Sequence, residues 1–410
     1  MLELKDINLS YGDKKILEDV NVSFAEGTVS VISGASGSGK SSLIKLLNGV
    51  IPQFVNADIK GDIIVDDNDI SQKDVAARSD FISTVFQNPK SQFYSINTTD
   101  EIVFALENRN LPKDEIVDTV KEYTEILGTK KLLDRDIFKL SGGEKQLLAI
   151  TAVACMKQKV YIFDEPSASL DIDAIKRLKS AIKTLKELGK IIIIVEHRLY
   201  YLKDILDKLY AIEDAKLIEL ESVDEESIKR HNLRTLNEIS KQELIEGCKD
   251  FSYRKVSVNN NSTSDLGKED RILSCRNYKY SYMKNRVFDF SIDFSRGIHF
   301  IIGENGIGKS TFVRCLCGLN KGFRKGFYYE NNFIKKPEKL ISLVMQDVNY
   351  QLFTESVLEE ISLVTDDEKL KEDVLVQLSL WDKRQQHPQS LSGGEKQRLS
   401  ISLCMASKKP

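Results

Sequence analysis

An internal repeat constrains the fold of this chain more than any other feature of its sequence. Residues 34–41 read GASGSGKS, and residues 303–310 read GENGIGKS. The seven letters LSGGEKQ occur at 140–146 and again, unchanged, at 391–397. The two motifs come in the same order in both halves. Because long-range self-similarity marks a duplicated structural unit, we expect two copies of one domain.

The expected organisation is two α/β domains joined by a linker. We expect the first domain at residues 1–220, the linker at 221–270 and the second domain at 271–410, which suits a chain of 410 residues. The short apolar runs VSVIS at 29–33 and IIIIV at 191–195 are typical of parallel strands buried on both faces. The linker is polar and carries a net negative charge, as solvated linkers do.

The composition excludes several classes of protein. Charged residues make up 30% and hydrophobic residues 41%, so intrinsic disorder is not expected. No apolar run approaches the roughly 18 residues of a membrane span, and the N-terminus lacks the apolar core of a signal peptide. With 59 basic and 62 acidic residues, the chain shows no basic domain for nucleic acid. The six cysteines lack the paired spacing of a zinc site.

The glycine-rich motif in each copy fits the pattern of a phosphate-binding loop. Its glycines let successive backbone N–H groups point at phosphate oxygens, and the helix that follows adds its positive end. The lysine reaches the β- and γ-phosphates, and the serine hydroxyl can bind Mg²⁺. The apolar run IHFII at 298–302 is the strand expected before the second loop. The nucleotide-binding residues expected are Gly34, Gly37, Gly39, Lys40, Ser41 and Ser42, and Gly303, Gly306, Gly308, Lys309, Ser310 and Thr311.

Two carboxylates and a histidine follow apolar runs of the first copy. Asp164, at the end of VYIFD, could bind Mg²⁺ directly or through water. Glu165 comes next, points differently and could polarise an attacking water, provided that it lies within hydrogen-bond reach. His197 follows the run 191–195. It is either a structural residue or a sensor of the γ-phosphate, and its place after a buried strand supports the second reading.

The LSGGEKQ motif opens a helix with apolar periodicity. Its serine is a good N-cap, and its two glycines expose backbone N–H groups to an anion. No lysine is aimed at a phosphate here, and each copy already has a phosphate loop. The motif is therefore expected to reach a nucleotide held by a different domain, through Ser141, Gly142 and Gly143 in the first copy and Ser392, Gly393 and Gly394 in the second.

Together these motifs resemble the nucleotide-binding domains of ABC ATPases, over nearly the whole chain except residues 221–270. GASGSGKS is similar to the Walker A loop, LSGGEKQ to the signature, and Phe163-Asp164-Glu165 to the end of Walker B. The resemblance implies two P-loop NTPase domains. Each would have a mainly parallel sheet core, a helical subdomain and an antiparallel β subdomain. It also implies ATP and Mg²⁺ as the bound groups.

The resemblance also implies roles for single residues. Tyr11 corresponds to the aromatic residue that stacks on adenine, and Tyr280 or Tyr282 would serve in the second copy. Ser169-Leu170-Asp171 is similar to the D-loop. The implied catalytic residues are Glu165, His197 and the Q-loop glutamine Gln87, and the implied metal ligands are Ser41, Gln87, Asp164, Ser310 and Gln346.

In that family two domains pair head to tail, so that each ATP lies between the Walker motifs of one domain and the signature of the other. The resemblance therefore implies intramolecular pairing of the two copies. In the first composite site Lys40, Glu165 and His197 would face the signature beginning at Ser392. In the second, Lys309, Ser310 and Gln346 would face the signature beginning at Ser141.

The second copy departs from this pattern at its C-terminus. In the first copy Asp164 lies a fixed number of residues after the signature serine, Ser141. The same number of residues counted from Ser392 would end beyond Pro410. We therefore expect the second domain to be incomplete, without its Walker B strand, glutamate, D-loop and histidine, and the full protein to continue. The absent strand would be central to the sheet, so a domain without it should fold poorly.

The sequence at and after each Q-loop looks like that of the ATPase subunits of energy-coupling-factor (ECF) importers, which take up vitamins or transition-metal ions. The segments are VFQNPKSQFYSINTTDEIVFALEN and VMQDVNYQLFTESVLEEI. This likeness implies two partners, a transmembrane coupling subunit and a substrate-binding membrane subunit. It also implies a peripheral location on the cytoplasmic face of the cell membrane.

Two other functions fit parts of the same evidence. Soluble tandem ABC ATPases that act on ribosomes share the motifs, but they usually carry a long, charged, helical inter-domain arm. The net negative linker of this chain argues against contact with RNA. A nucleotide switch that binds ATP without hydrolysis is the third possibility, and Glu165 and His197 argue against it at the first site.

Overall fold

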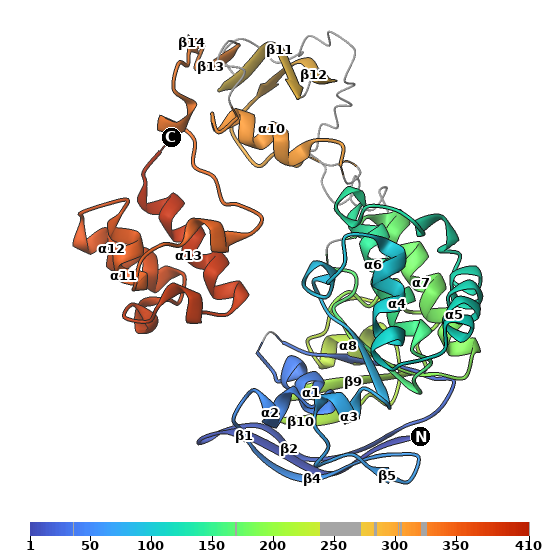
Figure 1. Ribbon diagram of the computed structural model, residues 1–410. Helices are drawn as coiled ribbons and strands as arrows, with labels where there is room; N and C mark the ends of the chain where they lie inside the picture. Colours follow the sequence, from blue (N-terminus) through green and yellow to red (C-terminus); the bar gives the residue numbers. More distant parts are fainter. Residues whose placement is uncertain are drawn as a thin grey trace. The chain divides into compact units, whose positions relative to one another are not determined.

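The computed structural model describes residues 1–410 except 36, 169, 238–271, 283–284, 302, 304–305, 321–325 and 410, and the side chains of 90, 277–279 and 282–290. It divides into two compact units, Met1–Lys249 and Asp250–Pro410. The position of one unit relative to the other is not determined, and each is described by itself (Figure 1).

The first unit contains two sheets. An antiparallel sheet has the strand order β2-β1-β4-β5, and a six-stranded sheet has the order β10-β9-β3-β8-β7-β6. In the larger sheet β9, β3, β8, β7 and β6 are parallel, and β10 pairs antiparallel with β9. The strands are β1 Leu2–Tyr11, β2 Lys14–Phe24, β3 Val29–Ser33, β4 Asp58–Val65, β5 Asn68–Asp69, β6 Ile82–Val85, β7 Val160–Asp164, β8 Ile191–Val195, β9 Lys208–Glu213 and β10 Lys216–Glu219.

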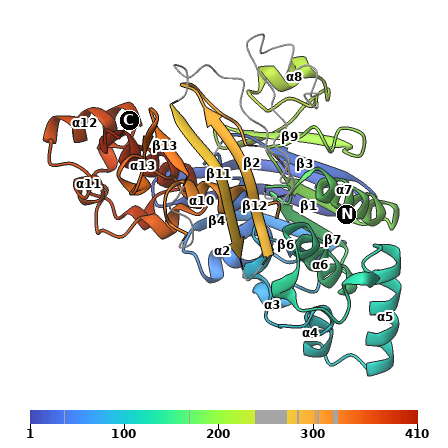
Figure 2. The ribbon, with the colours of Figure 1, turned by 90° about the horizontal axis from the view of Figure 1, so that it is seen from above.

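The larger sheet separates two hydrophobic cores of the first unit. All five side chains of β8 are fully buried, and they alternate between the cores. Ile192 and Ile194 join a core with α4 to α7, whereas Ile191 and Ile193 join a core with α1 and the antiparallel sheet. Helices α4, α5 and α6 lie beside one another in both views (Figures 1 and 2). The helices are α1 Lys40–Leu47, α2 Val50–Gln53, α3 Val75–Arg78, α4 Thr98–Asn108, α5 Lys113–Ile126, α6 Gly142–Cys155, α7 Ile172–Glu187 and α8 Glu225–Arg230.

Residues 221–237, which the sequence assigned to a linker, belong to the first unit. Ile228 of α8 and Leu236 are 1% and 2% exposed, and both pack into the core that holds α4 to α7. The Glu225 carboxylate accepts hydrogen bonds from the Thr235 hydroxyl at 2.6 Å and from the Leu236 N–H at 2.9 Å. The first domain therefore extends past residue 220. The remainder of the expected linker lies outside the described residues.

The described part of the second unit contains an antiparallel sheet and a group of helices. The sheet has the order β12-β11-β13-β14, and α10 shares its small core. A separate core joins α11, α12 and α13. The elements are β11 Leu273–Tyr282, β12 Asn285–Phe294, α10 Lys309–Leu316, β13 Phe327–Tyr329, β14 Asn332–Phe333, α11 Val357–Ser362, α12 Glu368–Gln377 and α13 Gly393–Ala406.

The strand expected at 298–302 is not formed in the described residues of that run. Ile298 and Phe300 are 83% and 72% exposed, although both are apolar. In the first unit the equivalent strand, β3, is held between β8 and β9. No described segment of the second unit takes those two places. The prediction of this strand was therefore wrong, because a central strand depends on neighbours that its own sequence does not supply.

Candidate active site

The first phosphate loop has a backbone that only glycine adopts readily. It joins β3 to α1, and Gly34, Gly37 and Gly39 have φ angles of 146°, 82° and 110°. A Cβ atom at Gly34 would lie 2.9 Å from the backbone oxygen of Ile212 on β9. Both the positive φ and this close approach exclude larger residues. The loop is thereby held against the sheet edge at which β3 ends.

Lys40, the first residue of α1, is folded into this loop. Its Nζ donates hydrogen bonds to the Gly34 oxygen at 2.9 Å and the Ala35 oxygen at 2.7 Å. The side chain is 5% exposed. Burial lowers the pKa of Lys40, while the charges of Glu165 and Asp164 oppose that shift. A buried cation inside a loop of glycines suits an anionic group such as a phosphate.

Glu165 contacts the two other residues predicted to act in catalysis. Its Oε2 accepts a hydrogen bond from Gln87 Nε2 at 2.9 Å, and its Oε1 lies 3.4 Å from His197 Nε2. These side chains follow β6, β7 and β8, whose carboxyl ends meet at one sheet edge. The bond to His197 lowers the pKa of the Glu165 carboxyl despite its burial, and the charges of His197 and Lys40 act in the same direction. The structure thus brings together three residues that are far apart in sequence.

Asp164 is partly buried at the end of β7, and its pKa shifts in the opposite direction to that of Glu165. Burial, and then the charge of Glu165, raise the pKa of the Asp164 carboxyl to about 6, against the opposing charges of Lys45 and Lys40. A partly buried carboxylate with this shift gains stability from a nearby cation. Oxygen ligands of this kind suit Mg²⁺. Asp164, the Ser41 hydroxyl at the exposed start of α1, and Gln87 all offer such oxygens, and their role as Mg²⁺ ligands stays a prediction.

Tyr11 lies beside the phosphate loop. It ends β1, and its hydroxyl donates a hydrogen bond to the Ser42 hydroxyl at 3.2 Å. The antiparallel sheet therefore places an aromatic side chain next to the helix that begins the nucleotide-binding segment. The contact of Tyr11 with a base stays a prediction.

Ser141 and the two glycines after it form the start of α6, and among the described residues no hydrogen bond joins them to the phosphate loop. Ser141 is the N-cap, and its hydroxyl accepts a hydrogen bond from the Glu144 N–H while Glu144 bonds back to the Ser141 N–H. Arg135 pairs with Glu144 at 2.7 Å. A Cβ atom at Gly143 would lie 2.5 Å from that of Ala174, so α6 packs closely on α7. The capping box and this packing fix the start of α6 against α7.

The second unit repeats part of the loop and the whole of the helix cap. Lys309 begins α10 after Gly308, and its Nζ donates a hydrogen bond to the Gly303 oxygen at 2.6 Å. Gly306 and Gly308 have φ angles of 84° and 108°. Ser392 caps α13 through the same reciprocal bonds, here with Glu395. Gly393 and Gly394 open that helix, and Ser310 and Thr311 follow Lys309 in α10.

Other residues expected at the second site are less well placed. Gln346 is exposed. Tyr280 is 8% exposed and belongs to the core around Phe312, so it acts as a core residue rather than a stacking platform. The side chain of Tyr282, the other candidate, lies outside the described residues, and so does Ser169 of the expected D-loop.

Comparison with known proteins decides the family. The family model described as "ABC transporter" matches residues 17–168 and 287–410. An ABC transporter ATP-binding protein of Treponema denticola is 36% identical over 416 residues, which cover 98% of this chain and 83% of the relative. The chain belongs to the ABC transporter ATP-binding family. It is an ABC ATPase, the ATP-hydrolysing subunit of a transporter.

Two further proteins are similar to this ABC ATPase. An ABC transporter ATP-binding protein of Sulfurisphaera tokodaii is 28% identical over 423 residues, covering 99% of this chain and 84% of the relative. Among solved structures, cbiO1 from Clostridium perfringens, described as part of the ABC transporter complex cbiONQ, is similar with a TM-score of 0.49 and 28% identity. That match covers 60% of this chain and 94% of the other.

Sequence reasoning missed two polar residues that shape the segment after Gln87. Gln92 accepts a hydrogen bond from the Phe86 N–H at 3.0 Å and donates one to the Thr84 oxygen at 3.1 Å. Glu101, 7% exposed, accepts bonds from the N–H groups after Phe93. Gln351 and Glu360 do the same in the second unit. Aligning the two copies residue by residue would have revealed both pairs, since each pair is identical.

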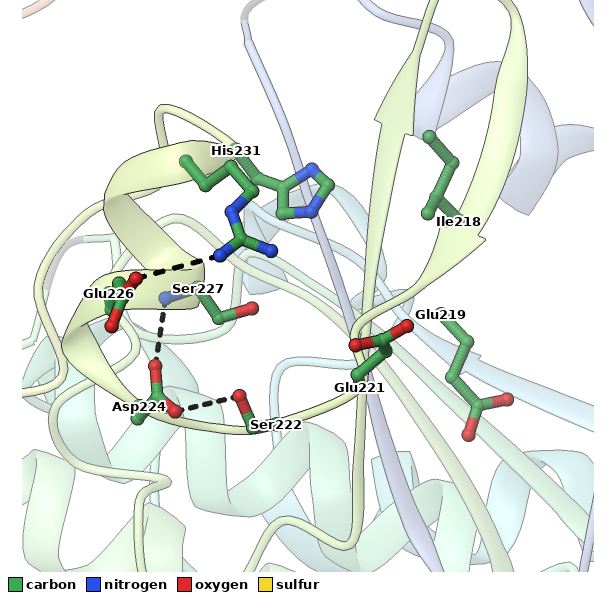
Figure 3. Close-up of a pocket in the computed structure, with 9 residues that line it drawn as sticks. Ile218, Glu219, Glu221, Ser222, Asp224, Glu226, Ser227 and His231 are labelled. Atoms are coloured by element: carbon green, nitrogen blue, oxygen red, sulfur yellow. Dashed lines mark hydrogen bonds and ion pairs between the residues drawn. The ribbon is translucent and has the colours of Figure 1, made fainter.

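A pocket of about 290 Å³ lies elsewhere in the first unit (Figure 3). It is formed by β10, α8 and the turn between them, and acidic side chains predominate on its walls. Asp224 accepts hydrogen bonds from the Ser227 N–H and the Ser222 hydroxyl. None of the predicted site residues lines it. The lining residues are Ile218, Glu219, Glu221, Ser222, Asp224, Glu226, Ser227, Arg230 and His231.

Proposed function

We propose that this ABC ATPase powers an importer of the ECF type, through ATP-driven closure of its two nucleotide-binding domains. The observation that carries the hydrolytic part of the proposal is the contact of Glu165 with both Gln87 and His197. These three residues lie at the sheet edge where Lys40 is buried and Asp164 is partly buried. Few structural roles would require so many charged groups at one edge.

The chain's own residues divide the work of hydrolysis at this edge. Lys40 and the loop N–H groups would hold the phosphates, and Tyr11 the base. Mg²⁺ would be held by Ser41, Asp164 and Gln87 and would neutralise charge on the phosphates. The Glu165 carboxylate is kept ionised by His197 and orients and polarises the attacking water at its Oε atoms. His197 would donate to the terminal phosphate.

The two signature helices complete the proposal. The helix beginning at Ser392 would face the first phosphate loop, and the helix beginning at Ser141 would face the second. Both helix starts have the same reciprocal cap and a basic partner on the capping glutamate, Arg135 in one unit and Lys383 in the other. This equivalence supports the proposal that each signature helix faces a phosphate loop.

An apolar patch on the first unit supports contact with a membrane subunit. It consists of Tyr94, Ile96, Phe104 and Phe138, which are 78%, 69%, 38% and 76% exposed. The rings of Tyr94 and Phe104 stack with centroids 5.2 Å apart, and the Ile96 oxygen accepts a bond from the Ile137 N–H. Exposed aromatic groups gathered in this way are typical of docking surfaces.

The second unit carries exposed apolar side chains in the equivalent segment. Tyr350, Phe353 and Leu363 are 72%, 77% and 66% exposed. No helix of the described chain is both long and apolar enough to cross a membrane. A transmembrane coupling subunit docked on both segments, with a separate subunit that binds the substrate, would place this ABC ATPase on the cytoplasmic face of the membrane. The vitamin or transition-metal substrate is proposed from the sequence likeness alone.

The patch provides a direct test of the partner. Tyr94→Glu should reduce, by tenfold or more, the amount of integral membrane protein that copurifies with the tagged chain from detergent-solubilised native membranes. Phe54→Glu is the matched control, since Phe54 is 71% exposed but lies at the end of α2. Equal copurification by both variants would contradict the assigned surface.

Uptake tests the importer itself. Native cells whose only copy carries Glu165→Gln should stop accumulating one labelled substrate from a panel of B vitamins, cobalt and nickel. Unchanged uptake of the whole panel, with the variant protein present at parental level, would contradict the ECF assignment.

A further inference from the structure

Two buried polar residues next to the catalytic cluster have no part in the roles described so far. Ser167 lies two residues after Glu165, and Glu196 lies directly before His197. Their side chains are 0% and 2% exposed. The Ser167 hydroxyl donates a hydrogen bond to Glu196 Oε1. The bond therefore joins the loop that carries Glu165 to the segment that carries His197, inside the protein.

The segment 196–198 contacts the loop through three consecutive residues. Glu196 accepts from the Ser167 hydroxyl, His197 lies 3.4 Å from Glu165, and the Arg198 guanidinium donates to the Ser167 oxygen at 3.3 Å. The central contact is the one in the catalytic cluster. The contacts on each side of it fix where the two backbones lie, so they limit how far Glu165 and His197 can separate.

Glu165 needs such support because its backbone is unfavourable. It has a φ of 42°, in the left-handed region that a non-glycine residue adopts only when its surroundings impose it. Its N–H bonds the Val195 oxygen at 2.8 Å, and the Ala168 N–H bonds its oxygen at 3.1 Å. The Glu196 N–H in turn bonds the Ile32 oxygen of β3, at 3.1 Å. The side-chain bond between Ser167 and Glu196 thus closes a rigid frame around the base.

We propose that Ser167 and Glu196 are positioning residues for ATP hydrolysis: their buried hydrogen bond holds Glu165 and His197 in the relation that turnover requires. Burying a carboxyl group costs free energy unless the group is hydrogen-bonded. The Ser167 hydroxyl therefore stabilises the buried side chain of Glu196, and removing either partner leaves the other without its bond. Burial raises the pKa of Glu196 to about 7, against the effect of the Ser167 bond. Both protonation states keep an acceptor oxygen for the serine, so the bond survives either state.

The inference rests on the proposed role of Glu165, and the test compares steady-state ATP hydrolysis by the full chain and its variants. Ser167→Ala should lower kcat about tenfold and leave KM for ATP within about twofold, because the base is displaced while the phosphate loop is untouched. Glu196→Gln keeps an acceptor oxygen and should stay within about threefold of the parental kcat. Glu196→Ala should resemble Ser167→Ala.

The double variant Ser167→Ala, Glu196→Ala separates positioning from simple loss of stability. If the two residues act as one unit, it should be no slower than either single variant. The matched control is Ser83→Ala, because the Ser83 hydroxyl donates an equally buried bond to Gln158, at 3.0 Å, elsewhere on the same sheet. Ser83→Ala should lower the melting temperature and leave kcat unchanged.

Three results would overturn the inference. They are a parental kcat in Ser167→Ala, losses that multiply in the double variant, and an equal loss of kcat in Ser83→Ala. Glu165→Gln, assayed beside them, distinguishes the two levels of the argument. Parental turnover in Glu165→Gln would refute the role of Glu165 itself, whereas an inactive Glu165→Gln with a fully active Ser167→Ala would refute only the positioning role.

Discussion

At the scale of residues, burial sets the chemistry of the site. Lys40 has a lowered pKa, and Asp164 and Glu196 have pKa values raised to about 6 and about 7. Each shift disfavours the charged form. Lys40 gains from an anion and Asp164 from a cation, so a ligand that brings both, such as a metal-bound nucleoside triphosphate, relieves both costs at once.

Glu196 gives a prediction about stability and pH. A carboxyl whose pKa is raised on folding contributes stability that is present below its unfolded pKa of about 4.5 and is lost as pH rises through about 7. Glu196→Gln removes this titration. We expect the free energy of unfolding to fall by about 2 to 3 kcal/mol less between pH 4.5 and pH 8 in the variant than in the parent. Urea unfolding of the nucleotide-free protein across this range measures the difference, and parallel curves would contradict it.

At the scale of elements, the two units share a device that shapes the segment after each Q-loop glutamine. Glu101 on α4 and Glu360 on α11 are buried, and each carboxylate accepts two backbone N–H bonds at 2.8 to 2.9 Å. Tyr94 and Phe353, whose rings are exposed, are among the residues whose backbone N–H groups are bonded in this way. Each element thus presents an apolar side chain to solvent from a fixed base, as a docking segment requires.

Removing that carboxylate should loosen the segment. Glu101→Ala leaves the N–H groups of Tyr94 and Ser95 without their acceptor, so we expect a loss of about 2 to 4 kcal/mol in the free energy of unfolding and faster amide exchange at both residues. Glu107→Ala, an exposed position on the same helix, is the control and should change little. Unchanged exchange at Tyr94 and Ser95 in Glu101→Ala would show that the carboxylate does not hold the segment.

Local pattern was enough to predict many elements, and it failed where an element depends on a distant neighbour. β3, β8, the two phosphate-loop helices and the two signature helices follow from apolar runs, glycines and caps within a few residues. The run 298–302 is as apolar as β3, but among the described residues no strand lies on either side of it. Tyr280 shows the same limit, because an alternating strand does not reveal which tyrosine faces the core. The bonds of Glu101 join residues that no short motif links.

At the scale of the whole molecule, the first unit contains two hydrophobic cores. The prediction from the sequence ended this domain too early, at residue 220. Ile228 and Leu236 fill the core after residue 220, where composition alone suggested a solvated linker. The family and the two copies could be predicted from the repeat. The end of the domain could not, since two apolar residues among many charged ones carry little signal.

The extent of the first unit can be measured with fragments. A fragment of residues 1–237 should fold cooperatively and bind ATP, because it contains both cores. A fragment of residues 1–220 lacks Ile228 and Leu236 and should be less stable by about 3 to 6 kcal/mol, at roughly 1.5 to 3 kcal/mol for each buried side chain. Equal melting temperatures of the two fragments would show that residues 221–237 add nothing to the core.

The central claim is that hydrolysis at the first site depends on Glu165, held between Gln87 and His197. The most direct measurement is ATP binding and single-turnover hydrolysis by the full chain and by Glu165→Gln, with Glu107→Gln as the control. We expect Glu165→Gln to bind ATP as the parent does and to hydrolyse it at least a hundredfold more slowly, while the control matches the parent. Hydrolysis at the parental rate by Glu165→Gln would contradict the account.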